Sequence, residues 1–217
     1  MKTIQTLLTV VVASLVITSN QPTQAAQYNL AGPGGVGTYS SGTISPNQVI
    51  PDNSPVGVGY GFDFSESGLK VDSLVLTLNM SGGFNGDMYG YLQHGGALIE
   101  LFNPASFSAG GASGSTLNLS LASGTGLSSL STAAAANLAG GSTWAASGDL
   151  NGFVGAQPFG LWTLHFADQG AGDKMTLNGF SLDITVVPEP TTWATMIFFG
   201  IGFAGFQTVR RIRNRRQ

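Results

Sequence analysis

Few side chains in this sequence could carry out chemistry, because charged residues make up only 9% of the 217-residue chain and cysteine is absent. Without cysteine there is no thiolate nucleophile, no disulfide framework and no sulfur-based zinc site. His94 and His165 are the only histidines, so a Ser–His–Asp triad would need one of them beside a serine and an acid. The central part of the chain also has no Gly-x-Ser-x-Gly motif. We therefore expect a protein that is not an enzyme.

Three aspartates lie at glycine-rich turns near the ends of predicted strands: Asp87, Asp168 and Asp173. Calcium takes about six to eight oxygen ligands, often from loop carboxylates and carbonyls. These aspartates are therefore candidate ligands of a structural calcium ion, and we expect no other cofactor. The alternative is that each carboxylate caps its own turn through a local hydrogen bond.

Tyr89 and Tyr91 are candidates for ligand contact, because they share one face of a predicted strand. An exposed aromatic ring presents an apolar face on which a sugar ring can pack. The alternative is that both rings belong to the hydrophobic core. A sugar site here would make the domain a carbohydrate-binding module.

The elements that would position these residues follow a period of two, which is typical of half-buried strands. Apolar side chains alternate with polar ones or glycine over residues 56–64, 74–80, 117–121, 162–166 and 180–186, and residues 98–102 form a short apolar run. Glycine-rich turns separate the runs, so we predict an all-β sandwich with Leu76 and Trp162 in its core. We interpret residues 26–48 as a Gly/Ser-rich linker with at most one edge strand, and residues 123–160 as a long loop with a helical turn at 133–136.

The N-terminus has the order of a secretory signal peptide, which we assign to residues 1–25. Lys2 precedes a short apolar run, and small residues surround the expected cleavage site after Ala25, with Ala26 as the second choice. A membrane anchor is the alternative, but the run of about 11 residues is shorter than the roughly 20 needed to span a bilayer.

The C-terminus combines Val187-Pro188-Glu189-Pro190, an apolar stretch at 191–209 and a basic tail. The stretch is long enough for a transmembrane helix, and the positive-inside rule keeps the basic tail cytoplasmic. The five arginines of this membrane-stop segment are Arg210, Arg211, Arg213, Arg215 and Arg216. A permanently anchored protein is the alternative to the resemblance described next.

This tripartite end, residues 187–217, resembles the PEP-CTERM sorting signal of exported proteins from Gram-negative bacteria that make extracellular polysaccharide. The resemblance implies that a membrane enzyme, an exosortase, recognises and cleaves the chain near Pro188-Glu189-Pro190. Signal peptidase would be the other processing partner. The protein would then be anchored transiently in the membrane and end at the cell surface or outside the cell.

A second resemblance covers residues 49–186, which are similar to the P domain (homo B domain) that follows the catalytic domain of proprotein convertases. It rests on residues 74–80, on Asn85-Gly86-Asp87, on residues 91–96 and on the closing segments Phe159 to Leu164 and 177–182, with Asp168 between them. The resemblance implies a jelly-roll-like β-sandwich and also points to calcium.

Charge excludes nucleic acid as a partner. Lys70 and Lys174 are the only lysines or arginines between Lys2 and the C-terminal arginines, and ten acidic residues precede Glu189 of the sorting segment. An acidic domain cannot neutralise a phosphate backbone. We expect a non-catalytic surface or matrix protein associated with exopolysaccharide in a biofilm. The alternatives are a calcium-dependent carbohydrate-binding module and a protease accessory domain.

Overall fold

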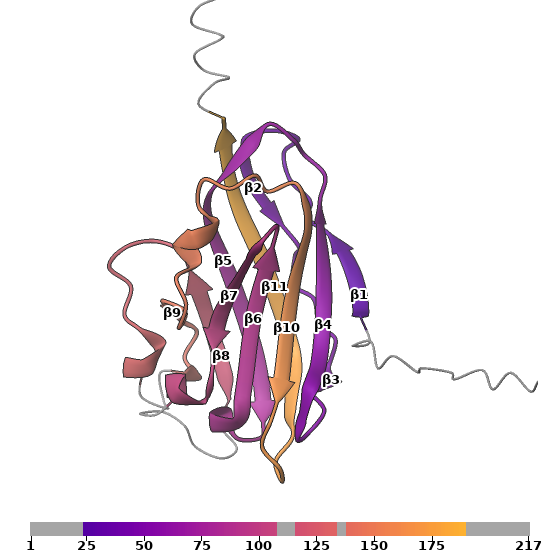
Figure 1. Ribbon diagram of the computed structural model, residues 1–217, viewed down its shortest axis with the longest axis vertical. Coiled ribbons are helices and arrows are strands. Elements are labelled where there is room, and N and C mark those ends of the chain that lie inside the picture. Colours follow the sequence, from indigo (N-terminus) through magenta and orange to yellow (C-terminus); the bar gives the residue numbers. More distant parts are fainter. Residues whose placement is uncertain (1–23, 108–115, 134–137, 190–217) are drawn as a thin grey trace, which may run out of the picture.

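The computed structural model describes residues 24–107, 116–133 and 138–189, which form two β-sheets packed face to face (Figure 1). The five-stranded sheet has the order β1 (Gln24–Asn29), β4 (Ser54–Phe64), β10 (Gly160–Asp168), β6 (Met88–His94) and β7 (Ala97–Phe102). The six-stranded sheet has the order β2 (Gly37–Ser40), β11 (Met175–Pro188), β5 (Leu69–Gly82), β8 (Leu117–Ala122) and β9 (Ser142–Trp144), with β3 (Gln48–Val49) paired to β11.

The core lies between the sheets and consists of the apolar side chains that alternate along each strand. Leu76 and Trp162 are both fully buried, as the alternation predicts. The ring of Phe180 on β11 lies 4.7 Å from that of Tyr60 and 5.7 Å from that of Phe62, so aromatic rings link the two sheets. The predicted all-β sandwich is confirmed.

The chain alternates between the sheets, passing from β4 to β5 to β6 and later from β9 to β10 to β11, as in a jelly roll. Short 3-10 helices join the described strands: η1 (Asn85–Asp87), η2 (Pro104–Phe107), η3 (Leu130–Thr132) and η4 (Leu150–Phe153). The region predicted as one long loop thus contains η3, β9 and η4, and it packs Trp144 and Phe153 into the core. The predicted helical turn at 133–136 falls largely outside the described residues.

The prediction of a linker at 26–48 is wrong. This segment supplies part of β1, all of β2 and the start of β3, and its side chains Leu30, Tyr39 and Ile44 are buried in the core. All three strands are short, and β1 and β2 are edge strands with few apolar residues each. The sandwich therefore begins near residue 24 rather than at 49.

At both ends, the described chain begins or finishes inside a predicted processing segment. β1 begins at Gln24, so it contains Ala25 and Ala26 on either side of the predicted cleavage site. β11 ends at Pro188, inside the predicted sorting motif. The rest of the signal peptide, the apolar stretch at 191–209 and the five arginines lie outside the described residues. Within the part of the chain that is described, no helix is long and apolar enough to cross a membrane.

Candidate functional site

Three turns meet at the end of the sandwich where β10 finishes. Asp168 pairs with Ser54 on β4 and with Met88 on β6, and the turn after it reaches the other two turns through the backbone. The Gln169 amide donates to the carbonyl oxygen of Asp87 over 3.0 Å, and the Asn53 amide donates to that of Gly170 over 2.8 Å. We call four polar residues of these three turns the acidic end: Asp52, Asn85, Asp87 and Asp168.

Asp168 is the most buried carboxylate of the acidic end, with 1% of its surface exposed. Its Oδ1 accepts a hydrogen bond from the Gly170 amide over 3.3 Å, whereas its Oδ2 is buried with no hydrogen-bond partner among the described residues. Burial raises the pKa of Asp168, and the nearby charges of Asp52 and Asp87 raise it further. Backbone amides of Gly170 and Met175 partly offset that rise.

Two neighbouring side chains also have buried polar atoms without a partner. Asp52 accepts a hydrogen bond from the Gly172 amide through Oδ2 over 3.2 Å, but its Oδ1 is buried and unpaired within the described chain. Asn85 is completely buried, and neither Oδ1 nor Nδ2 has a partner in the described residues. Buried polar groups are paired in the large majority of cases, so these orphaned atoms make the acidic end a candidate ligand site.

Glycine is required at position 170 by close approach. A Cβ added there would overlap the carboxylate of Asp87, so any larger residue would displace it from the acidic end. The turn 169–174 therefore keeps Asp87 beside the buried Asp168, although 81 positions separate them in the sequence.

The donor atoms of the acidic end fit calcium better than any other common ion. All its side-chain donors are carboxylate or amide groups, and calcium prefers such oxygens. Among the described residues no group of three or more His, Cys, Asp or Glu side chains could hold a metal ion, so Asp52, Asp87 and Asp168 do not together form a metal site in this geometry. A calcium ion beside Asp168 would therefore take at most two of the aspartates together with amide or carbonyl oxygens, and its charge would compensate the buried carboxylate.

The acidic end includes two of the three predicted ligands and adds two that the sequence did not identify. Asp87 and Asp168 are brought together, whereas Asp173 lies exposed in the same turn. Asp52 and Asn85 occur in Pro51-Asp52-Asn53 and Asn85-Gly86-Asp87, which read in the sequence only as turn formers. The pattern Pro-Asp-Asn is the one signal that could have drawn attention to Asp52.

Tyr89 and Tyr91 lie on the outward face of β6, partly exposed. Tyr91 pairs with His165 on β10 and with Glu100 on β7, so polar groups flank its ring on both sides. Burial raises the pKa of the Tyr91 hydroxyl, and the charge of Glu100 and then Tyr89 add to the rise. The two tyrosines stay a predicted ligand-contact surface.

Both histidines are held by backbone carbonyls. The His94 ring stacks on Trp162 with 4.0 Å between ring centroids, and its Nδ1 and Nε2 lie 3.1 Å and 2.7 Å from the carbonyl oxygens of Leu161 and Gln157. Nε2 of His165 lies 2.9 Å from the carbonyl oxygen of Val56. These contacts are typical of histidines with a structural role.

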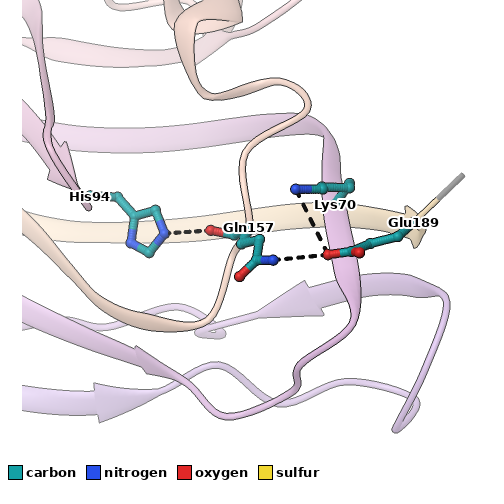
Figure 2. A network of polar contacts seen from close by, with 4 residues as sticks. All are labelled: Lys70, His94, Gln157 and Glu189. Carbon is teal, nitrogen blue, oxygen red and sulfur yellow. Dashed lines mark hydrogen bonds and ion pairs between the residues drawn. The ribbon is translucent and has the colours of Figure 1, made fainter. Parts of the chain in front are cut away.

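The opposite end of the sandwich holds the start of the predicted sorting motif (Figure 2). Val187 and Pro188 pair with Lys70 and Leu69 on β5 as the last residues of β11. Glu189 Oε1 accepts a hydrogen bond from Gln157 Nε2 over 2.9 Å and lies 3.8 Å from Lys70 Nζ. The backbone oxygen of the same Gln157 contacts His94, so these contacts connect the motif to the core.

Comparison with known proteins identifies the C-terminus. Residues 186–214 match the PEP-CTERM protein-sorting motif. The motif implies an exported protein that an exosortase recognises, anchored transiently in the membrane through its C-terminal region. No curated protein matches the chain.

Two solved structures resemble the fold. The complex of a serine protease of Aeromonas sobria with its chaperone has a TM-score of 0.40 and 13% identity over 68% of this chain and 26% of that chain. The serine protease of Aeromonas sobria itself has a TM-score of 0.36 and 14% identity over 65% of this chain and 26% of that chain. This chain thus spans about a quarter of the chains it resembles. Similarity at this level carries no argument about function, and the P-domain resemblance stays a prediction.

Proposed function

We propose that this chain is a non-catalytic protein of the cell surface or extracellular matrix, delivered by an exosortase and associated with exopolysaccharide in a biofilm. The observation that carries the proposal is the sorting motif at 186–214, which begins within the last strand of the sandwich. Exosortase cleavage would therefore release the whole described sandwich as one folded unit.

The absence of catalysis is supported by the environment of the two histidines. His94 and His165 use ring nitrogens on backbone carbonyls, which favours a structural role over proton transfer. A protein of this kind acts through its surfaces.

Mass spectrometry of the protein recovered from the cell surface tests the sorting step. The mature chain is expected to start at Ala26 or Gln27 and to end between Val187 and Thr191. The same protein from cells that lack the exosortase should retain residues up to Gln217. An intact arginine-rich tail on the surface form of normal cells would refute exosortase processing.

A second candidate function is calcium-dependent binding, which the orphaned atoms of the acidic end favour. Asp168 Oδ2, Asp52 Oδ1 and both polar atoms of Asn85 are buried without partners in the described structure. Calcium bound there would fix the three turns relative to one another, as calcium commonly does in exported proteins. Thermal melting with calcium and with chelator tests this function.

A further inference from the structure

A groove crosses the outward face of the six-stranded sheet, on the side away from Tyr89 and Tyr91. It has a volume of about 360 Å³, and its walls come from β5, β8, β11 and the loop before β3. Every residue that lines it is uncharged. We call it the amide groove and define it by six side chains: Thr43, Thr77, Asn79, Asn118, Asn178 and Ser181.

Strand register arranges these side chains as two parallel rows. Thr77 on β5 pairs with Ser181 on β11 and Ser120 on β8, which makes a row of three hydroxyls. Asn79, two residues further along β5, pairs with Asn118 on β8. Neighbouring strands lie about 4.8 Å apart, so each row presents hydrogen-bonding groups at a regular spacing across the sheet.

Hydrogen bonds between these side chains fix their positions. Asn178 Nδ2 donates to Asn79 Oδ1 and to Ser81 Oγ, each over 2.9 Å. The hydroxyls of Thr77 and Ser120 lie 3.0 Å apart. An asparagine amide has two donors and an acceptor oxygen with two lone pairs. These contacts use both donors of Asn178, whereas its Oδ1 can still accept and Asn79 Nδ2 can still donate.

The groove is hollow at its centre because β11 has a bulge beside Asn79. The register with β5 shifts between Leu177 and Gly179, and Gly179 then pairs with Asn79. A Cβ added at Gly179 would lie 3.2 Å from the carbonyl oxygen of Ile44, so the space here depends on glycine. The bulge also makes Asn178 an extra residue between the paired positions, where its amide reaches across to β5.

We propose that the amide groove binds a segment of a neutral polysaccharide. A sugar hydroxyl both donates and accepts hydrogen bonds, as do asparagine, serine and threonine side chains. A polysaccharide rich in uronate or sulfate would need cationic side chains, whereas the groove has none and Asp183 lies outward on β11 just beyond it. This inference rests on the proposed association with exopolysaccharide and names the class of sugar polymer that is bound.

Affinity of the groove for one short segment is weak, because each hydrogen bond to the sugar replaces one to water. A polymer offers the same segment many times, which raises the apparent affinity of one groove in proportion to the number of segments. The inference therefore predicts binding to long chains and little binding to single sugars.

Affinity gel electrophoresis of the full chain in detergent micelles tests the inference with four soluble polymers: a β-glucan, a galactomannan, dextran and the polyuronate alginate. At least one of the three neutral polymers should retard the protein, and alginate should not. Retardation by alginate alone, or by no polymer, would overturn the inference.

Variants locate the site. Thr77→Val keeps the shape of a β-branched side chain and removes one hydroxyl, and Asn79→Leu removes an amide of similar size. The double variant should bind the neutral polymer at least about tenfold more weakly. Thr185→Val is the matched control, because Thr185 lies outward on the same strand as Ser181 and outside the groove. Equal binding by the double variant and the control, or loss of binding in Tyr91→Ala with the groove intact, would overturn the inference.

Cell fractionation separates this inference from the proposed function. If the parent protein is found in the matrix fraction and the double variant in the medium, both the groove and the proposed function are supported. A double variant that stays in the matrix as the parent does would refute the groove and leave the proposed function intact. A parent protein absent from the matrix would refute the proposed function itself.

Discussion

Replacing Asp168 by asparagine should stabilise the calcium-free protein near pH 7 and remove its response to calcium. Asp168 Oδ2 is buried without a partner in the described structure, and the charges of Asp52 and Asp87 lie nearby. Asparagine has the same shape, keeps an acceptor for the Gly170 amide and carries no charge. An unsatisfied buried polar group costs about 1–3 kcal/mol, and a charged one costs more. The amide nitrogen that replaces Oδ2 stays unpaired but carries no charge, so only the excess cost of the charge is removed, and the free energy of unfolding should rise by about 1 kcal/mol.

In calcium, the parent should be more stable than Asp168→Asn, which is the reverse of the order in chelator. An ion at a hundredfold excess over its Kd adds about 2.7 kcal/mol to the stability of the parent. For a domain of this size that corresponds to a rise in Tm of about 5–10 °C. The variant lacks the central carboxylate and should gain less than about 2 °C. Magnesium should substitute poorly in the parent, because it requires tighter octahedral geometry.

Thermal melting of the full chain in detergent micelles, followed by circular dichroism, measures both effects. Asp183→Asn is the matched control, since Asp183 is a partly exposed carboxylate on β11 away from the acidic end. It should change neither the Tm in chelator nor the response to calcium. If the parent melts identically in calcium and chelator, the acidic end does not bind the ion. If Asp168→Asn is less stable than the parent in chelator, our account of the buried charge is wrong.

Three further predictions concern pH, the core and the sorting motif. In chelator, the pKa of Asp168 is raised in the folded state, so its charge costs stability as the pH rises through the unfolded pKa of about 3.9 and beyond. The Tm of the parent should therefore fall from pH 4 to pH 7 by more than the Tm of Asp168→Asn. An equal fall of Tm in the two proteins would contradict this. Leu76→Asp should leave the domain unfolded at 25 °C by circular dichroism, because an unpaired carboxylate in the core costs several kcal/mol, whereas a cooperative melt like that of the parent would refute the assigned core face. Lys70→Met should speed amide hydrogen exchange at Val187 and Glu189 about two- to fivefold. The reason is the loss of the partly exposed ion pair with Glu189, which is worth about 0.4–1 kcal/mol. Lys174→Met, at the other end of β11, should leave that exchange unchanged.

The central strands could be predicted from the sequence, because each carries a long alternation that a two-sided sheet requires. In β5, the apolar residues Leu74, Leu76, Leu78 and Met80 lie at every second position and are all buried, whereas the side chains between them are only partly buried or exposed. Strands β1 and β2 could not be predicted in the same way. They are short edge strands anchored by isolated residues such as Leu30 and Tyr39, in a segment whose glycine and serine content is typical of a linker.

The candidate sites depend on chain segments that are distant in sequence, and this limits what a pattern can identify. Asp52, Asp87 and Asp168 each lie in an ordinary turn, and nothing local indicates that the three turns meet. The amide groove was invisible for a related reason. Thr77, Asn79 and Asn118 read simply as the solvent side of strands until the register placed them in adjacent rows and the bulge at Gly179 opened a hollow between them.

The position of β11 determines when the sandwich can form during export. β11 is the last strand in the chain, yet it lies between β2 and β5 in the interior of its sheet and also pairs with β3. Among the described strands, β2 and β3 pair only with β11 in that sheet, so neither can join the sheet before β11 arrives. Residues up to Pro188 must therefore cross the membrane before the sheet closes, and the part of the sandwich that precedes Met175 waits outside in an incomplete state. β11 completes the sheet and also carries the start of the sorting motif. The sheet therefore closes at the time when the motif reaches the membrane.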